Sequence, residues 1–419
     1  MFHLKAKWLA LLGGAILAAS PAMGQDQALI NILIKKGILN EEEAKQITKE
    51  LVTEDASSNV STSGSKFIKK LTISGRIQSQ YAGLSTNVDD ATIQPNATGH
   101  FFLRRIYLGA KAEFGQGWSG NLNYDFASTS FDAAFIQWKQ SDQFVLDMGF
   151  RKAPIGLEEW DTSSGSLKAI ERSPITRYFV ESNNGRRLGA GSYRTGVFVG
   201  GTNDGFFYNV AITNPERDEF SSLNGNSDPG VQAGGTAANN NLAYWGNVGY
   251  KGKFTNGSYR FGTSVGMLPD QGGLVLGKGD DLTVYSIYGV LTAGNLDLEG
   301  EYFGAKDDHG ISASRDASPT GYWIQPAYKF TDKIEGVIRY SYVDSDGRGV
   351  NLSDGTRSAP SGGTMDKMSE WYFGGNYFFR GNDVKLQVGY IHAESKDTVT
   401  GAHAQAKADG LRSQIQVNF

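Results

Sequence analysis

Basic side chains offer the clearest chemistry in this sequence. Seven of them lie within one polar stretch: Arg151, Lys152, Lys168, Arg172, Arg177, Arg186 and Arg187. Lysine and arginine attract anions, and the planar guanidinium group can donate hydrogen bonds to two phosphate oxygens at once. Five acids share the stretch: Glu158, Glu159, Asp161, Glu171 and Glu181. The pattern predicts an anion-binding or mixed-charge surface, with Lys168, Arg172 and Arg177 as its strongest candidates.

Further charges recur at every second position of strand-like segments. The basic ones are Arg76, Arg105, Lys111, Lys329, Arg339, Lys385 and Arg412. The acidic ones are Glu113, Asp125, Asp147, Asp297, Glu299, Glu301 and Glu335. Cations lining a narrow passage lower the cost of anion entry, whereas a mixed ring creates a transverse field without strong ion preference. We select Arg76, Arg105 and Arg339 from the basic set as additional anion-binding candidates.

Catalytic groupings are weak. The chain has no cysteine, which excludes disulfides, thiolate metal sites and cysteine nucleophiles. Residues 262–266 (GTSVG) match a nucleophile-elbow pattern, but they lie inside a predicted strand with no helix after them. The four histidines after residue 24 are scattered. We therefore expect no enzyme, no catalytic or metal site and no cofactor, and the formal charge of −4 gives no reason to expect nucleic acid.

The elements that must position these charges are strands. In residues 71–81 (LTISGRIQSQY), apolar and polar side chains alternate, as they do in residues 118–126 and 411–419. Strands are expected near 69–81, 101–115, 117–127, 131–140, 143–153, 193–202, 205–214, 241–254, 258–268, 281–293, 295–306, 320–331, 333–344, 367–380, 383–395 and 409–419.

The connections alternate between short and long. Tight turns rich in Gly, Asn and Asp, such as 115–117, 203–204 and 255–257, alternate with long polar stretches such as 154–192, 215–240 and 345–366. Short turns at one end and long loops at the other are typical of outer-membrane barrels. We therefore predict an all-β, transmembrane antiparallel barrel of about sixteen strands, wide enough for a water-filled channel.

The first 66 residues differ from the rest. A basic start and the apolar run LALLGGAILAA predict a signal peptide over residues 1–24. Helical spacing in residues 25–51, followed by a polar linker, predicts a periplasmic helical arm and linker over 25–66, which leaves 67–419 as the barrel domain. The final aromatic residue, Phe419, resembles the signal read by the barrel assembly machinery.

Two stretches resemble a known family. Residues 101–128 (FFLRRIYLGAKAEFGQGWSGNLNYDFAS) and 146–174, followed by 185–191, resemble the phosphate-selective porin O/P family, and the order and spacing agree over roughly 350 residues. The resemblance implies a homotrimer of sixteen-stranded barrels in the bacterial outer membrane, in contact with its lipid. It also implies a third loop folded into each pore and passive uptake of small anionic or polar solutes, phosphate among them.

Several functions remain open at this stage. The acids beside Lys168, Arg172 and Arg177 also suit a general porin without phosphate selectivity. Trp160, Tyr178 and Phe179 could form a surface for sugars instead. A third alternative is a structural barrel whose helical arm links the outer membrane to a periplasmic partner.

Overall fold

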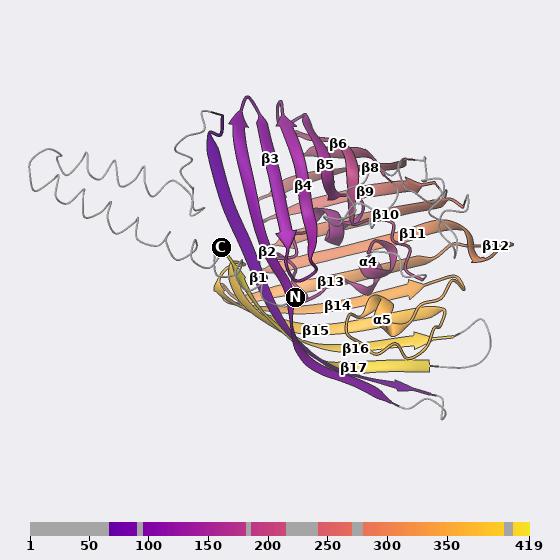
Figure 1. Cartoon of the computed structure of the whole chain (residues 1–419). Coiled ribbons are helices and arrows are strands. Elements are labelled where there is room, and N and C mark those ends of the chain that lie inside the picture. Colours follow the sequence, from indigo (N-terminus) through magenta and orange to yellow (C-terminus); the bar gives the residue numbers. More distant parts are fainter. Residues whose placement is uncertain (1–66, 90–94, 182–185, 215–241, 270–279, 398–404) are drawn as a thin grey trace, which may run out of the picture. The chain divides into compact units, whose positions relative to one another are not determined.

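The strands of the described residues form one closed sheet. The computed structural model describes residues 67–89, 95–181, 186–214, 242–269, 280–397 and 405–419, and these form a single antiparallel sheet of 17 strands. The first strand pairs with both the second and the last, so the sheet has no free edge. Sixteen strands form the wall, and the three-residue β12 (Arg315–Ala317) belongs to a hairpin that extends from it (Figure 1). The predicted sixteen-stranded antiparallel barrel is confirmed.

The wall strands follow one another in chain order. They are β1 (Lys70–Val88), β2 (Asn96–Gly115), β3 (Trp118–Asp125), β4 (Ser130–Lys139), β5 (Val145–Lys152), β6 (Tyr193–Asn203), β7 (Phe206–Thr213), β8 (Ala243–Phe254), β9 (Gly257–Leu268), β10 (Leu282–Ala293), β11 (Leu296–Ser312), β13 (Thr320–Thr331), β14 (Ile334–Asp344), β15 (Lys367–Arg380), β16 (Val384–Lys396) and β17 (Gln405–Asn418). Within the described residues, the connections hold three short helices: η1 (Gly156–Asp161), α4 (Pro174–Phe179) and α5 (Leu352–Gly355).

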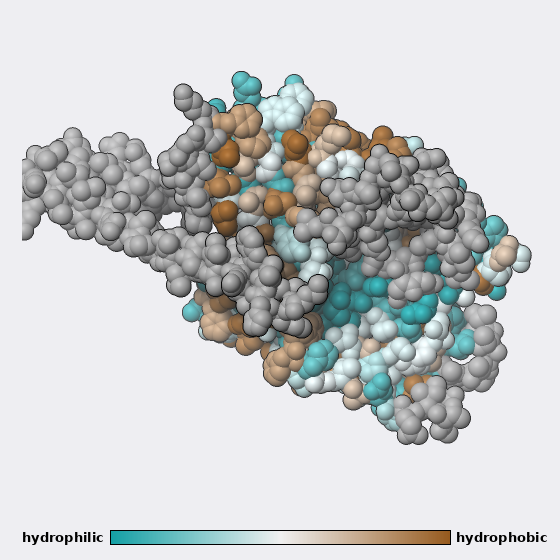
Figure 2. Space-filling model, in the orientation of Figure 1, coloured by the Kyte–Doolittle hydropathy of each residue, from teal (hydrophilic) through white to brown (hydrophobic). Residues whose placement is uncertain are grey.

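The two faces of the sheet have opposite character. In β15, Trp371 and Phe373 point outward and are exposed, whereas Glu370, Tyr372 and Asn376 point inward and are buried. Figure 2 shows hydrophobic residues on the outer face of the first strands and hydrophilic residues in the hollow beside them. Apolar outside and polar inside is the reverse of a soluble protein and suits a barrel surrounded by lipid.

The strand ends differ from the prediction mainly on the side of the long loops. The first strand extends to Val88 rather than to residue 81, and β11 continues to Ser312 rather than to residue 306. Apolar and polar residues alternate poorly in these extensions, because the extensions lie outside the region in which one face of the strand must be apolar. The predicted signal peptide, helical arm and 215–240 loop lie outside the described residues. No helix in the described part of the chain has the length and apolarity needed to cross a bilayer.

Candidate functional site

The connection between β5 and β6, residues 153–192, is called the third loop here, and its described residues, 153–181 and 186–192, lie inside the ring of strands. Its side chains Ile155, Ile170, Ile175, Tyr178 and Phe179 are at most 1% exposed. Helix α4 begins with Pro174 at its first position, and the Ser173 hydroxyl caps it by accepting from the Thr176 backbone N–H. Phe179 stacks on Phe303 of β11, with 5.3 Å between ring centroids. The third loop therefore forms its own core against the inner wall.

Amide and lysine side chains on the wall hold the middle of the third loop. Gln416 donates to the carbonyl of Gly165 (3.0 Å), and Lys385 donates to the carbonyl of Leu167 (2.9 Å). Asn376 donates to the carbonyl of Lys168 (2.9 Å). The loop backbone thus finds inside the barrel the partners that buried carbonyls require.

A buried acid network joins the two halves of the third loop. Glu158 accepts from the Ser173 backbone N–H (2.8 Å) and the Thr176 hydroxyl (2.7 Å). Arg172 pairs with Glu159 (2.8 Å), which also pairs with Lys152 (3.3 Å). Burial acts to raise the pKa of Glu159, but the positive charges of Arg172 and Lys152 outweigh it and hold the pKa below its usual value.

A second connection, residues 345–366 between β14 and β15, also lies inside the ring; we call it the seventh loop. Val350 and Leu352 are fully buried, and Asn351 and Asp354 form a capping box around α5. The sequence suggested only a polar outer loop here. Its repeated glycines and charges conceal the few apolar side chains that make it fold inward.

The third and seventh loops are tied to each other. Arg177 donates to the carbonyls of Ser353 (3.2 Å) and Asp354 (3.3 Å). Arg186 pairs with the Asp354 carboxylate (2.8 Å), and the Tyr178 hydroxyl donates to the carbonyl of Gly349 (3.2 Å). The two loops therefore act as one body within the lumen.

Arginines gather where the two loops meet the wall. The arginine cluster, as we define it, consists of Arg104, Arg177, Arg187, Arg357 and Arg412. Arg104 and Arg357 donate to the Glu171 carboxylate (2.7 and 3.3 Å), and Arg412 lies 3.7 Å from it. Glu181 forms ion pairs with Arg357 (3.2 Å), Arg187 (3.2 Å) and Arg177 (3.7 Å). Five guanidinium groups thus surround two carboxylates, a formal excess of three positive charges.

The crowding of these charges affects their ionisation. Burial, followed by the neighbouring Arg177 guanidinium, lowers the pKa of Arg357 to about 10. Burial acts to raise the pKa of Glu171, but Arg104 and Arg357 outweigh it and hold the pKa well below its usual value. The pKa of Glu181 is lowered in the same way, chiefly by Arg177 and Arg357. Both acids therefore stay ionised at neutral pH and allow the arginines to lie together.

Arg104 enters the cluster through a β-bulge. Pairing between β1 and β2 shifts register so that Gln78 faces Arg105 while Ser79 faces Leu103. The extra residue turns both Arg104 and Arg105 inward, which strict alternation would forbid. The prediction missed Arg104 and Arg357; two consecutive arginines within an alternating segment were the available signal for Arg104.

The cations predicted from the sequence form two groups according to their partners, and those of the first group pair with carboxylates. Lys168 pairs with Glu299 and lies 3.8 Å from Asp297, and Arg172, Lys152 and Arg151 each have a carboxylate partner. Arg339 pairs with Glu370 (2.8 Å), Arg186 with Asp354 and Arg187 with Glu181.

Two predicted cations have neutral partners. Arg105 donates to Gln78 (2.7 Å), while Arg76 donates to Asn418 (2.7 Å) and Ser164 (2.7 Å). Neither has a carboxylate within ion-pair distance among the described residues. Both point into the lumen, and the charge of Arg105 also acts on Glu171 within the arginine cluster.

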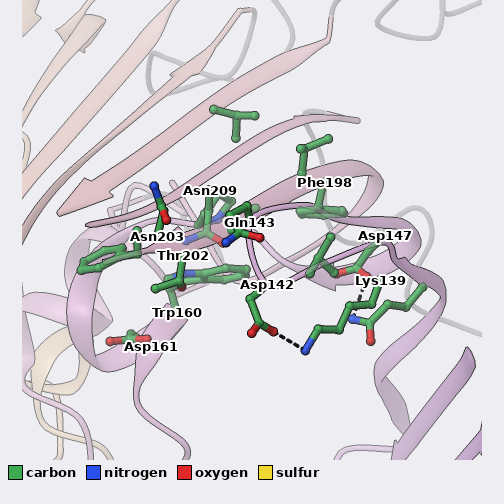
Figure 3. A pocket seen from close by; sticks show the side chains of 18 of the residues that line it. Lys139, Asp142, Gln143, Asp147, Trp160, Asp161, Phe198, Thr202, Asn203 and Asn209 are labelled. Atoms are coloured by element: carbon green, nitrogen blue, oxygen red, sulfur yellow. Dashed lines mark hydrogen bonds and ion pairs between the residues drawn. The ribbon is translucent and has the colours of Figure 1, made fainter. Parts of the chain in front are cut away.

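A cavity of about 920 Å³ lies against the first turns of the third loop (Figure 3). Trp160 and Asp161 of η1 line it together with the tight turns 141–143 and 202–204. Of the three aromatic residues considered for a sugar surface, only Trp160 lines this cavity. Tyr178 and Phe179 are fully buried in the loop core, so they offer no surface to a solute.

Comparisons with known proteins agree with this architecture. A family model described as "Phosphate-selective porin O and P" matches residues 71–419. An anion-selective porin from Comamonas acidovorans has 14% identity and a TM-score of 0.56, covering 83% of this chain and 99% of that one. The OmpF porin of Salmonella typhi in complex with daunomycin has 12% identity and a TM-score of 0.53, and the match covers 86% of this chain and 100% of that one. The DcaP channel of Acinetobacter baumannii has 13% identity and a TM-score of 0.52, and the match covers 85% of this chain and 99% of that one. Curated protein sequences give no match to the chain.

Proposed function

The chain belongs to the phosphate-selective porin O and P family, and we propose that its barrel passes small anions, phosphate among them, through a passage narrowed by the third and seventh loops. Family and fold make it a channel of the bacterial outer membrane for small solutes and not an enzyme. The finer question is which solutes it selects.

The observation that carries the proposal is the arginine cluster. Its excess of three positive charges lies at the junction of both loops with β2 and β17, and the charge of Arg105 also acts on Glu171. A passing anion is attracted there and a cation is repelled, because charges on a low-dielectric wall act strongly on ions in a narrow passage. Guanidinium groups also offer phosphate paired donors, which chloride cannot use as fully.

Lys168 and Arg172 serve a different purpose in this proposal. Their charges are matched by Glu299 and Glu159, so they fix the third loop rather than attract solutes. Arg177 belongs to both groups, because it holds the seventh loop through backbone carbonyls and contributes its charge to the arginine cluster.

We also propose that the protein assembles as a homotrimer, that residues 1–24 are removed on export, and that residues 25–66 form a periplasmic arm. In addition, we propose that Phe419, whose ring is exposed on the outer face at the end of β17, is read by the barrel assembly machinery. Crosslinking of the purified protein, followed by intact mass measurement, tests the first two points.

The test of selectivity is a planar-bilayer reversal potential in a potassium chloride gradient, repeated with added phosphate. An anion-selective potential together with phosphate block of the chloride current supports the proposal. Arg104→Gln is then expected to weaken the block more than Lys168→Gln does. A potential near zero, or of cation-selective sign, without phosphate block would instead make the protein a general porin. The balanced charges of the cavity in Figure 3 are the feature that favours this second candidate.

A further inference from the structure

The cavity beside Trp160 differs in charge from the arginine cluster. Four cations and four acids line it: Lys139, Arg151, Lys251, Arg260, Asp142, Asp147, Asp161 and Asp204. It is bordered by the short turns 141–143 and 202–204, which identify its end of the barrel as the periplasmic one. Because the formal charges cancel, this cavity does not continue the anion preference of the arginine cluster.

Three ion pairs give the cavity local polarity instead of net charge. Arg260 of β9 pairs with Asp161 of η1, Arg151 of β5 with Asp147, and Lys139 of β4 with Asp142. The side chains of Arg260, Asp161 and Arg151 remain 26%, 21% and 24% exposed, so water and solutes can reach them. Partly solvated pairs of this kind exchange partners at little cost.

Flat aromatic surfaces adjoin these pairs. The Arg151 guanidinium lies 4.9 Å from the ring centre of Trp160 and 5.2 Å from that of Phe198, and the Arg260 guanidinium lies 4.4 Å from that of Phe207. Figure 3 shows Trp160 and Asp161 on one side of the cavity and the Lys139–Asp142 pair on another. Since Trp160 directly precedes Asp161, an aromatic surface and a cation–acid pair lie side by side.

We propose that this cavity is a second solute subsite and that it binds zwitterions of the aromatic amino acid class. An α-amino acid carries its ammonium and carboxylate on one carbon, so the two charges can insert between the adjacent Asp161 and Arg260. The ammonium then faces Asp161, the carboxylate faces Arg260, and the aromatic ring lies against Trp160. An anion without an ammonium group can contact Arg260 but also faces the negative charge of Asp161. A cation without a carboxylate can contact Asp161 but also faces the positive charge of Arg260.

Three probes with the same ring separate the possibilities: L-phenylalanine, phenylacetate and phenethylamine, which at pH 7 are a zwitterion, an anion and a cation. Each is added to the periplasmic side of the full-length protein in a planar bilayer, and the concentration that halves the potassium chloride current is measured. We expect phenylalanine to half-block at a concentration at least fivefold lower than either analogue. Equal or stronger block by phenylacetate that persists in Arg357→Gln, a variant of the arginine cluster, would overturn the proposal, because it would mean that the cavity is only another anion site.

The matched variant is the double substitution Asp161→Asn with Arg260→Gln. It removes one charge of each sign, so the net charge of the channel is unchanged. We expect it to abolish the preference for phenylalanine, and Trp160→Ala to weaken phenylalanine block at least threefold. If the double variant does not fold, Trp160→Ala alone decides the question, since unchanged block in that variant refutes the subsite.

The variant Arg357→Gln distinguishes this test from the test of the anion proposal. Arg357 lies in the arginine cluster, so its substitution should reduce anion selectivity and leave phenylalanine block unchanged. A wild-type channel that shows no anion selectivity but prefers phenylalanine would refute the first proposal only. A channel with anion selectivity and no such preference would refute the second only.

Discussion

Replacing Arg357 by glutamine tests the arginine cluster directly. Arg357 lies on the seventh loop, and its guanidinium contacts both Glu171 (3.3 Å) and Glu181 (3.2 Å) while remaining 29% exposed. Both acids keep other arginine partners in the variant, Arg104 for Glu171 and Arg187 for Glu181. The loops should therefore stay in place while the formal excess falls from three positive charges to two.

The size of the effect follows from Coulomb's law. At about 6 Å in a water-like dielectric, one unit charge is worth about 0.7 kcal/mol to a passing ion. Removing it should lower anion entry about threefold and, because cations gain what anions lose, change the anion-to-cation permeability ratio by up to about tenfold. Screening at about 0.1 M salt reduces the change in the ratio to about fourfold.

The assay is the reversal potential in a potassium chloride gradient, with Arg315→Gln as the control. Arg315 is exposed on β12, so its loss changes the total charge equally without affecting the arginine cluster. Arg357→Lys keeps the charge but loses the planar fork; it should preserve the reversal potential and weaken phosphate block. If wild-type protein is anion-selective and Arg357→Gln shifts the ratio no more than Arg315→Gln does, the arginine cluster is not the source of selectivity.

Three further predictions concern the acids that hold the loops. Glu171→Gln should make the channel more anion-selective in reversal potential, yet lower its melting temperature, because Arg104 and Arg357 lose their shared partner. The pKa values of Glu171 and Glu181 are lowered on folding, so the stability that these acids contribute is complete above about pH 4.5 and is lost as the pH falls through their folded pKa values. The melting temperature should therefore stay constant from pH 7 to 5 and fall at lower pH. It should fall less steeply in the double variant Glu171→Gln with Glu181→Gln. Asp354→Asn weakens the pair with Arg186 and the α5 capping box; single-channel recordings should show more open-channel noise, and equal noise would mean that α5 is held by other contacts.

The fold was predictable because a membrane barrel imposes one simple rule on many residues. Each strand must present apolar side chains outward at every second position, and the tight turns require Gly, Asn and Asp. The predicted and observed limits of the strand at 367–380 therefore coincide. Where the rule no longer applies, as beyond residue 81 in β1, the prediction ended the strand too early.

The site was less predictable because its contacts join distant parts of the chain. Lys168 pairs with Glu299, and Arg357 with Glu171, across more than 130 and 180 positions of sequence. Alternation identified inward charges such as Arg105 and Arg339 correctly, since register alone decides them. It could not identify Arg104, which a bulge turns inward, or the inward fold of the seventh loop.

The structure gives Glu171 and Glu181 a different role from the one that the sequence suggested. Glu171 and Glu181, read along the chain beside Arg172 and Arg177, suggested a mixed-charge surface without strong ion preference. In the barrel they lie at the centre of the arginine cluster, where five guanidinium groups without them would repel one another and face a high desolvation cost. Two carboxylates offset part of that cost and leave a net positive charge at the lumen. The net charge of such a passage is therefore set by which charges share a position in space, and acids that lower the net charge can still be what holds a cluster of arginines together.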